Sequence, residues 1–157
     1  MIEKEFVKRV NIDKAKNKTV IPIFLTIISL LTYIFPLILG DFDFGIIFEV
    51  LTLVFTIIAR TYMNNYKIVG AKVFTILAMI PIGWILIYDF ITMITTASDA
   101  MDFAMLGIDY YVGEVLTILE LVALFRINID LAKAENPEKY KESTDWFYEK
   151  YEEDIKN

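Results

Sequence analysis

The chain of 157 residues contains neither cysteine nor histidine. The first absence excludes disulfide bonds and thiol nucleophiles, and the second excludes the commonest general base. Together they remove the usual ligands of zinc and of most transition-metal sites. The acidic residues also lack the spacing of a calcium-binding loop. We therefore expect no metal and no cofactor.

Signatures of catalysis are missing as well. The sequence has no phosphate-binding Walker motif, no dinucleotide fingerprint, no nucleophile elbow and no metalloprotease helix. A net charge of −6 gives no general reason to expect nucleic acid as a partner. We expect a protein that is not an enzyme and does not bind nucleic acid.

Long hydrophobic stretches are what the sequence does have. Hydrophobic residues make up 57% of the chain and the mean hydropathy is +0.53, whereas soluble proteins are about 45–50% apolar. A helix of about 20 apolar residues crosses the hydrocarbon core of a bilayer. The sequence predicts an all-α integral membrane protein with short loops and four transmembrane helices, over about 20–39, 44–63, 73–97 and 110–131.

Details of these stretches refine the prediction. The stretch from Val20 to Leu39 carries no charge and is longer than the apolar region of a signal peptide, so we interpret it as a retained anchor. Pro81 and Gly83 lie in the middle of the third stretch and predict a kink. Residues 98–109 are typical of a short helix at the membrane surface.

The basic residues predict the orientation. All 15 Lys and Arg residues lie in 1–19, in 60–72 or from Arg126 onward, and none lies in 40–45 or 89–114. Cytoplasmic segments carry the Lys/Arg excess, so both termini are expected in the cytoplasm of a multi-pass protein of the cell (plasma) membrane. A three-span arrangement would place six basic residues on the wrong side.

The two terminal segments differ in character. Residues 1–19 form a basic amphipathic segment that suits anionic lipid headgroups. Residues 132–157 predict a cytoplasmic helical tail, with Asn136 as N-cap and Pro137 at the first helical position. This tail fits docking on the protein itself, on a sister subunit or on another protein. Its apolar stripe is formed by Tyr140, Thr144, Phe147, Tyr151 and Ile155.

Glu120 is the main candidate for a functional residue. It lies near the middle of the fourth span, where a carboxylate costs roughly 2.5–3.5 kcal/mol on insertion, so it should face the bundle interior. Thr117 lies one turn away on the same face. The second span carries a matching polar stripe of Glu49, Thr52, Thr56 and Arg60. If the two faces meet, they form an acidic and hydroxyl-rich track that leads toward Arg60.

Two interpretations of Glu120 stay open at this point. In one, it is a proton or cation site at the middle of the membrane. In the other, it forms a hydrogen bond that locks the packing of the helices. Asp89 is expected near the outer interface, and Arg60 and Arg126 are expected to anchor the cytoplasmic boundary by snorkelling.

The functional hypotheses follow this division. The first is a small interaction or accessory subunit, regulatory or of the immunity type that protects against a membrane-acting toxin, which binds a protein partner through its bundle and tail. The alternative is a small oligomeric transporter or channel that uses Glu120 as an intramembrane proton or cation site. Both have the lipid bilayer as their surroundings, and both allow a homo-oligomer.

Overall fold

A computed structural model describes residues 2–40, 43–96 and 108–137, and every regular element in these residues is a helix. Three helical segments within them are long and apolar enough to cross a membrane, namely Lys4–Thr32, Gly45–Asn64 and Ile68–Thr95. The all-helical, membrane-type architecture predicted from the sequence is therefore confirmed at this level. The expected surface helix at 98–109 and the expected tail helix fall almost wholly outside the described residues.

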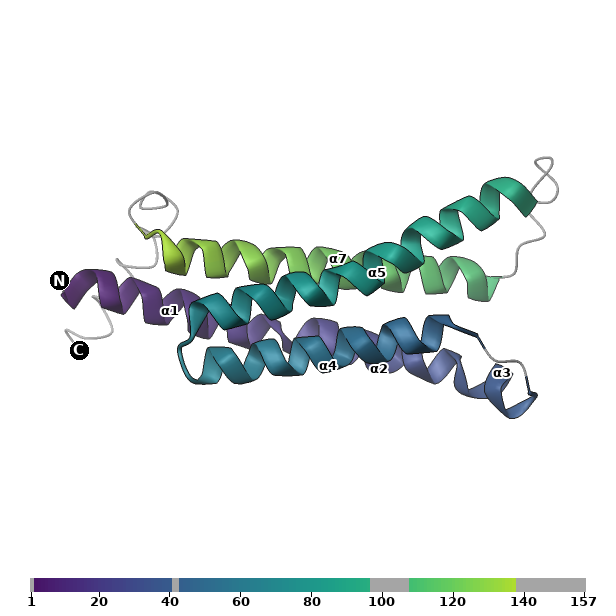
Figure 1. The fold of residues 1–157 in the computed structure, drawn as a ribbon, viewed down its shortest axis with the longest axis horizontal. Coiled ribbons are helices and arrows are strands. Elements are labelled where there is room, and N and C mark those ends of the chain that lie inside the picture. The colour runs from purple at the N-terminus through teal and green to yellow at the C-terminus, as the bar shows by residue number, and fades with distance from the viewer. Residues whose placement is uncertain (1, 41–42, 97–107, 138–157) are drawn as a thin grey trace.

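Residues 2–32 form a nearly continuous rod (Figure 1). Helix α1 (Ile2–Lys18) joins α2 (Val20–Thr32) at Thr19, and Pro22 lies in the first turn of α2, where a missing N–H costs little. The short helix α3 (Ile34–Ile38) follows a break at Tyr33. The stretch that the sequence predicts as one helix over 20–39 is thus divided into two.

The rest of the described chain completes a bundle. Helix α4 (Gly45–Asn64) and helix α5 (Ile68–Thr96) form a hairpin that turns at Tyr66, which has a φ of 54°. Helix α7 (Ile108–Glu135) then returns along α5 and α1. Figure 1 shows α5 and α7 on one side of the bundle and α1, α2 and α4 on the other, with α5 diverging from α4 toward Thr96.

Two helices are longer than the sequence predicts. Helix α5 begins at Ile68 rather than Val73, and α7 ends at Glu135 rather than Leu131. The added turns bury Ile68 and Ala134 against the neighbouring helices. Burial of apolar surface therefore extends both helices beyond the hydrophobic stretch itself.

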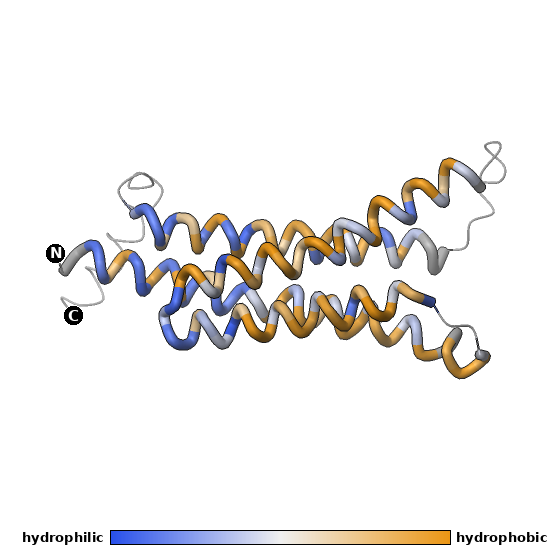
Figure 2. The backbone as a smooth tube through the Cα atoms, viewed as in Figure 1, coloured by the Kyte–Doolittle hydropathy of each residue, from blue (hydrophilic) through white to orange (hydrophobic). Residues whose placement is uncertain are grey.

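The two ends of the bundle have opposite chemical character. We call the end with α1, the α4–α5 turn and the last turns of α7 the basic end, and the end with Asp43, Asp89 and Glu114 the acidic end. Figure 2 shows the hydrophilic residues concentrated toward the basic end and apolar residues along most of the remaining length. The core at the basic end is apolar and includes Ile12, Ala15, Met63, Ile68, Ile127 and Leu131.

Away from the basic end the usual distribution of residues is inverted. Large apolar side chains cover the outside; Phe24 is 61% exposed and Ile80 is 60% exposed. The interior instead holds polar side chains, namely Thr26, Ser29, Glu49, Thr52, Thr56, Thr75, Thr117 and Glu120. In water such an arrangement would be unfavourable, because soluble proteins bury their large apolar residues. The pattern fits surroundings of lipid.

Gly70 allows the close contact between α4 and α5. A Cβ atom at position 70 would overlap the ring of Tyr62, which stacks on Phe74 with ring centroids 5.4 Å apart. We expect Gly70→Ala to destabilise the protein by about 1–3 kcal/mol through overpacking. Thermal unfolding in detergent measures the change.

Gly83→Ala on the same helix is the matched control for this substitution. A Cβ atom at position 83 meets nothing within 4 Å, and alanine favours the helix by up to about 1 kcal/mol. An unfolding midpoint for Gly70→Ala equal to or above that of the wild type would contradict the packing described here.

Candidate functional site

Two glutamates occupy the centre of the polar interior. Glu49 on α4 and Glu120 on α7 have no exposed surface at all. Their two carboxyl groups come within electrostatic range of one another in the bundle interior. Helices α4 and α7 therefore each contribute one carboxyl group to the interior of the bundle.

The hydrogen bonds of this carboxyl pair are incomplete. The Ser29 hydroxyl donates to Glu49 Oε1 at 2.7 Å. Among the described residues, Glu49 Oε2 and both carboxyl oxygens of Glu120 receive no hydrogen bond. Thr26 lies beside Glu120, but its hydroxyl donates to the Pro22 carbonyl at 2.7 Å. Three carboxyl oxygens of the pair therefore lie in the bundle interior without a hydrogen-bond donor among the described residues.

The buried threonines around the pair add further acceptors. Each hydroxyl donates its hydrogen to the backbone carbonyl four residues earlier on its own helix: Thr26 at 2.7 Å, Thr52 at 3.0 Å, Thr56 and Thr75 at 2.8 Å, and Thr117 at 2.9 Å. A hydroxyl has one hydrogen and two lone pairs. Since these hydrogens are already used, the threonines can offer only lone pairs to a neighbour or a ligand.

At the acidic end a second pair of carboxyl groups lies between α5 and α7. The side chains of Asp89 and Glu114 lie within hydrogen-bonding range of each other. Two carboxyl groups can form such a bond only through a proton held between them. Both side chains are half-buried, in contrast with the fully buried Glu49 and Glu120.

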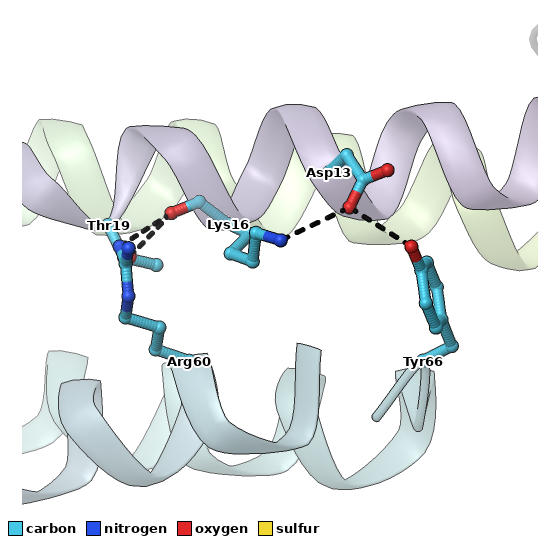
Figure 3. Close-up of polar contacts among 5 residues, drawn as sticks. All are labelled: Asp13, Lys16, Thr19, Arg60 and Tyr66. Carbon is cyan, nitrogen blue, oxygen red and sulfur yellow. Dashed lines mark hydrogen bonds and ion pairs between the residues drawn. The ribbon is translucent and has the colours of Figure 1, made fainter. Parts of the chain in front are cut away.

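Arg60 at the basic end is turned toward α1. Its Nη1 donates to Thr19 Oγ1 at 2.6 Å and to the Lys16 carbonyl at 3.0 Å, as Figure 3 shows. Thr19 itself donates to the same carbonyl at 2.6 Å. These contacts join α4 to the α1–α2 junction. The sequence predicts a snorkelling anchor here, whereas the guanidinium makes specific contacts within the bundle.

Two ion pairs join α7 to α1 and to α5 at the basic end. Lys18 pairs with Asp130, whose side chain is only 4% exposed. Lys72 on α5 pairs with Glu135 at 2.6 Å. The positively charged side chains in these ion pairs lie at the basic end. Among the described residues, no lysine or arginine pairs with Glu49 or Glu120.

The sequence-predicted site residues are distributed as follows. Five are buried in the interior: Glu49, Thr52, Thr56, Thr117 and Glu120. Arg60 lies half-buried at the basic end. The predicted docking stripe of the tail, from Tyr140 to Ile155, lies outside the described residues.

Sequence reasoning missed the polar face of α2. Thr19, Thr26 and Ser29 are all buried and face the interior. Their separations of seven and three residues place them on one side of a helix, which is the signal that could have revealed them. Asp130 and Lys18 were missed because nothing in their local sequence indicates an ion pair between residues 112 positions apart.

Comparison of the chain with protein-family models, with curated proteins and with solved structures finds no match. The fold defines the class of the protein as an all-helical bundle in which three helical segments are long and apolar enough to span a membrane. The interior defines it further as a bundle with a buried carboxyl pair.

Lys18→Ala would leave the buried Asp130 without its cation. Because Lys18 itself is a third exposed, we expect a loss of about 2 kcal/mol of stability, below the cost of breaking a fully buried pair. Unfolding in detergent measures this loss. Lys16→Ala is the control, since its partner Asp13 is 44% exposed and the pair should contribute below about 1 kcal/mol. Equal effects of the two substitutions would contradict a structural role for the Lys18–Asp130 pair.

Proposed function

We propose that the protein crosses the cell membrane four times, with both termini in the cytoplasm. Helix α7 has 28 residues and packs against α5, α1 and α2, so it shares their surroundings. Its most deeply placed acidic residue, Glu120, is turned away from the outer surface. The Lys and Arg residues of α1, of the α4–α5 turn and of the last turns of α7 lie at the end that holds α1, which supports a cytoplasmic location for that end.

We further propose that the bundle is a small transporter or channel for a proton or another small monovalent cation. The observation that carries this proposal is the set of three carboxyl oxygens, Glu49 Oε2 and both oxygens of Glu120, that no donor among the described residues reaches. A carboxyl group in this position is costly unless something compensates it. A bound cation supplies that compensation.

The surrounding hydroxyls support a cation rather than an anion. The threonine hydrogens are bound to backbone carbonyls, so the interior offers lone pairs and few free donors. Carboxylate and hydroxyl oxygens are the ligands of hard cations and the acceptors of proton relays. An anionic ligand would meet repulsion from both glutamates.

The alternative role of Glu120, a lock on helix packing, has less support. A buried polar side chain strengthens helix association in a membrane through the hydrogen bonds that it makes across the interface. Glu120 makes none with either oxygen among the described residues. Its burial therefore adds cost without a compensating contact, which is typical of a functional residue.

The proposed mode of action is exchange at a buried site rather than flow through an open pore. The basic end of the bundle is filled by a close-packed apolar core, and such a core leaves no water-filled passage. The cation would therefore reach the basic face only when that end rearranges, or along an interface with further copies of the protein.

Glu120→Gln tests the proposal in proteoliposomes. Glutamine keeps the size of the side chain but cannot exchange a proton or balance a cation. We expect flux, followed with an internal pH-sensitive dye and with cation gradients, to fall by at least about tenfold. The unfolding midpoint should stay near that of the wild type.

Glu5→Gln, at an exposed position on α1, is the control and should leave flux unchanged. Wild-type vesicles that show no flux above protein-free vesicles would refute the transport proposal, as would full flux in Glu120→Gln.

The sequence of the tail supports a second candidate function, an accessory subunit that binds a membrane partner. Its basis is the apolar stripe of residues 140–155 in an otherwise charged segment. Removal of residues 137–157 should abolish capture of a stoichiometric foreign subunit after gentle extraction, while membrane insertion is retained. Native mass spectrometry measures the stoichiometry. A partner retained by the shortened chain would remove the tail from this role.

A further inference from the structure

Resting on the proposed cation function, we infer that the Glu49–Glu120 site exchanges its cation with the acidic end of the bundle, past Tyr33. In the described conformation the basic end is closed by Arg60 and by the apolar core beneath it. In this conformation the site therefore exchanges with the acidic face alone.

Polar side chains at the acidic end extend to within one helical turn of Glu49. The Tyr33 hydroxyl lies directly over Gly45, at 2.6 Å from the place where a Cβ atom would be, and Asp43 Oδ1 lies 3.1 Å from the same point. Glu49 follows Gly45 by one turn of α4. A phenol and a carboxylate thus stand together one turn above the buried pair.

Tyr33 links the surface groups to the buried groups. The charges of Glu49, Asp43, Asp89 and Glu120 all act on its hydroxyl. A phenol can both donate and accept a hydrogen bond, so it can pass a proton or shield a cation between two sets of carboxyl groups. The break between α2 and α3 places Tyr33 at this position, and the absence of a side chain at Gly45 gives it room.

The basic end offers no comparable route. The Arg60 guanidinium is held by Thr19 and by the Lys16 carbonyl, and its positive charge opposes the approach of a cation (Figure 3). Beyond it the helices meet through Ala59, Met63, Leu124 and Ile127, all at most 1% exposed. Close-packed apolar side chains at this level exclude water.

The absence of cysteine makes the inference directly testable. Thr117→Cys places a thiol on α7, one turn from Glu120 toward the acidic end. Thr56→Cys places a thiol on α4, between Glu49 and the basic end. Each variant is reconstituted and exposed to a membrane-impermeant methanethiosulfonate reagent from one face at a time. Asn65→Cys, in the exposed α4–α5 turn, identifies the face that carries the basic end.

We expect Thr117→Cys to react at least about tenfold faster from the acidic face than from the basic face. Thr56→Cys should resist reagent added at the basic face, because the apolar core at that end excludes water. Tyr33→Ala should speed the reaction of Thr117→Cys from the acidic face. Val50→Cys, which faces the lipid on the same helix as Glu49, should stay unmodified by the charged reagent.

Faster modification of Thr56→Cys from the basic face than from the acidic face would overturn the inference. So would equal reaction of Thr117→Cys from both faces, or none from either. Thiol reaction does not depend on transport, so the two proposals fail separately. One-sided reaction without flux in wild-type vesicles would refute the transport proposal alone, and flux with access from the basic face would refute the one-sided route alone.

Discussion

The structure depends on one constraint, which is that polar side chains on membrane-spanning helices must be kept away from lipid. Each of the four long helical rods carries a hydroxyl or carboxyl group on the face that it turns inward, and large apolar residues cover the outside. In water the hydrophobic effect would drive the opposite arrangement. Helix pairing here encloses the polar groups, and α4 and α5 approach closely where Gly70 lacks a side chain.

The same constraint explains the division of the bundle into two parts. At the basic end, charged residues are paired with each other and the core is apolar, which gives a stable base. Toward the acidic end the core is polar and its carboxyl pair is not fully satisfied. Proteins tolerate such local cost where function requires it, and the well-packed end supplies the stability that permits it.

Much of this could be predicted from the sequence because lipid imposes a simple rule on spans. The hydrophobic stretch at 44–63 predicted α4 to within one residue, and the intervals between Glu49, Thr52 and Thr56 predicted their common face. Contacts between distant segments could not be predicted. The pairing of Lys18 with Asp130, the inward turn of Arg60 and the place of Tyr33 over Gly45 all depend on how the helices pack.

The central claim is that Glu49 and Glu120 lie near each other inside the bundle. Chemical cross-linking measures this proximity most directly. The wild-type chain has no cysteine. The double variant Glu49→Cys/Glu120→Cys is treated with a short bifunctional thiol reagent and analysed by intact-protein mass spectrometry. The account predicts one reagent molecule bound at both ends within a single chain. Val50→Cys/Glu120→Cys should not be bridged, because Val50 faces outward. Bridging of the Val50 pair, with none of the Glu49 pair, would contradict the account.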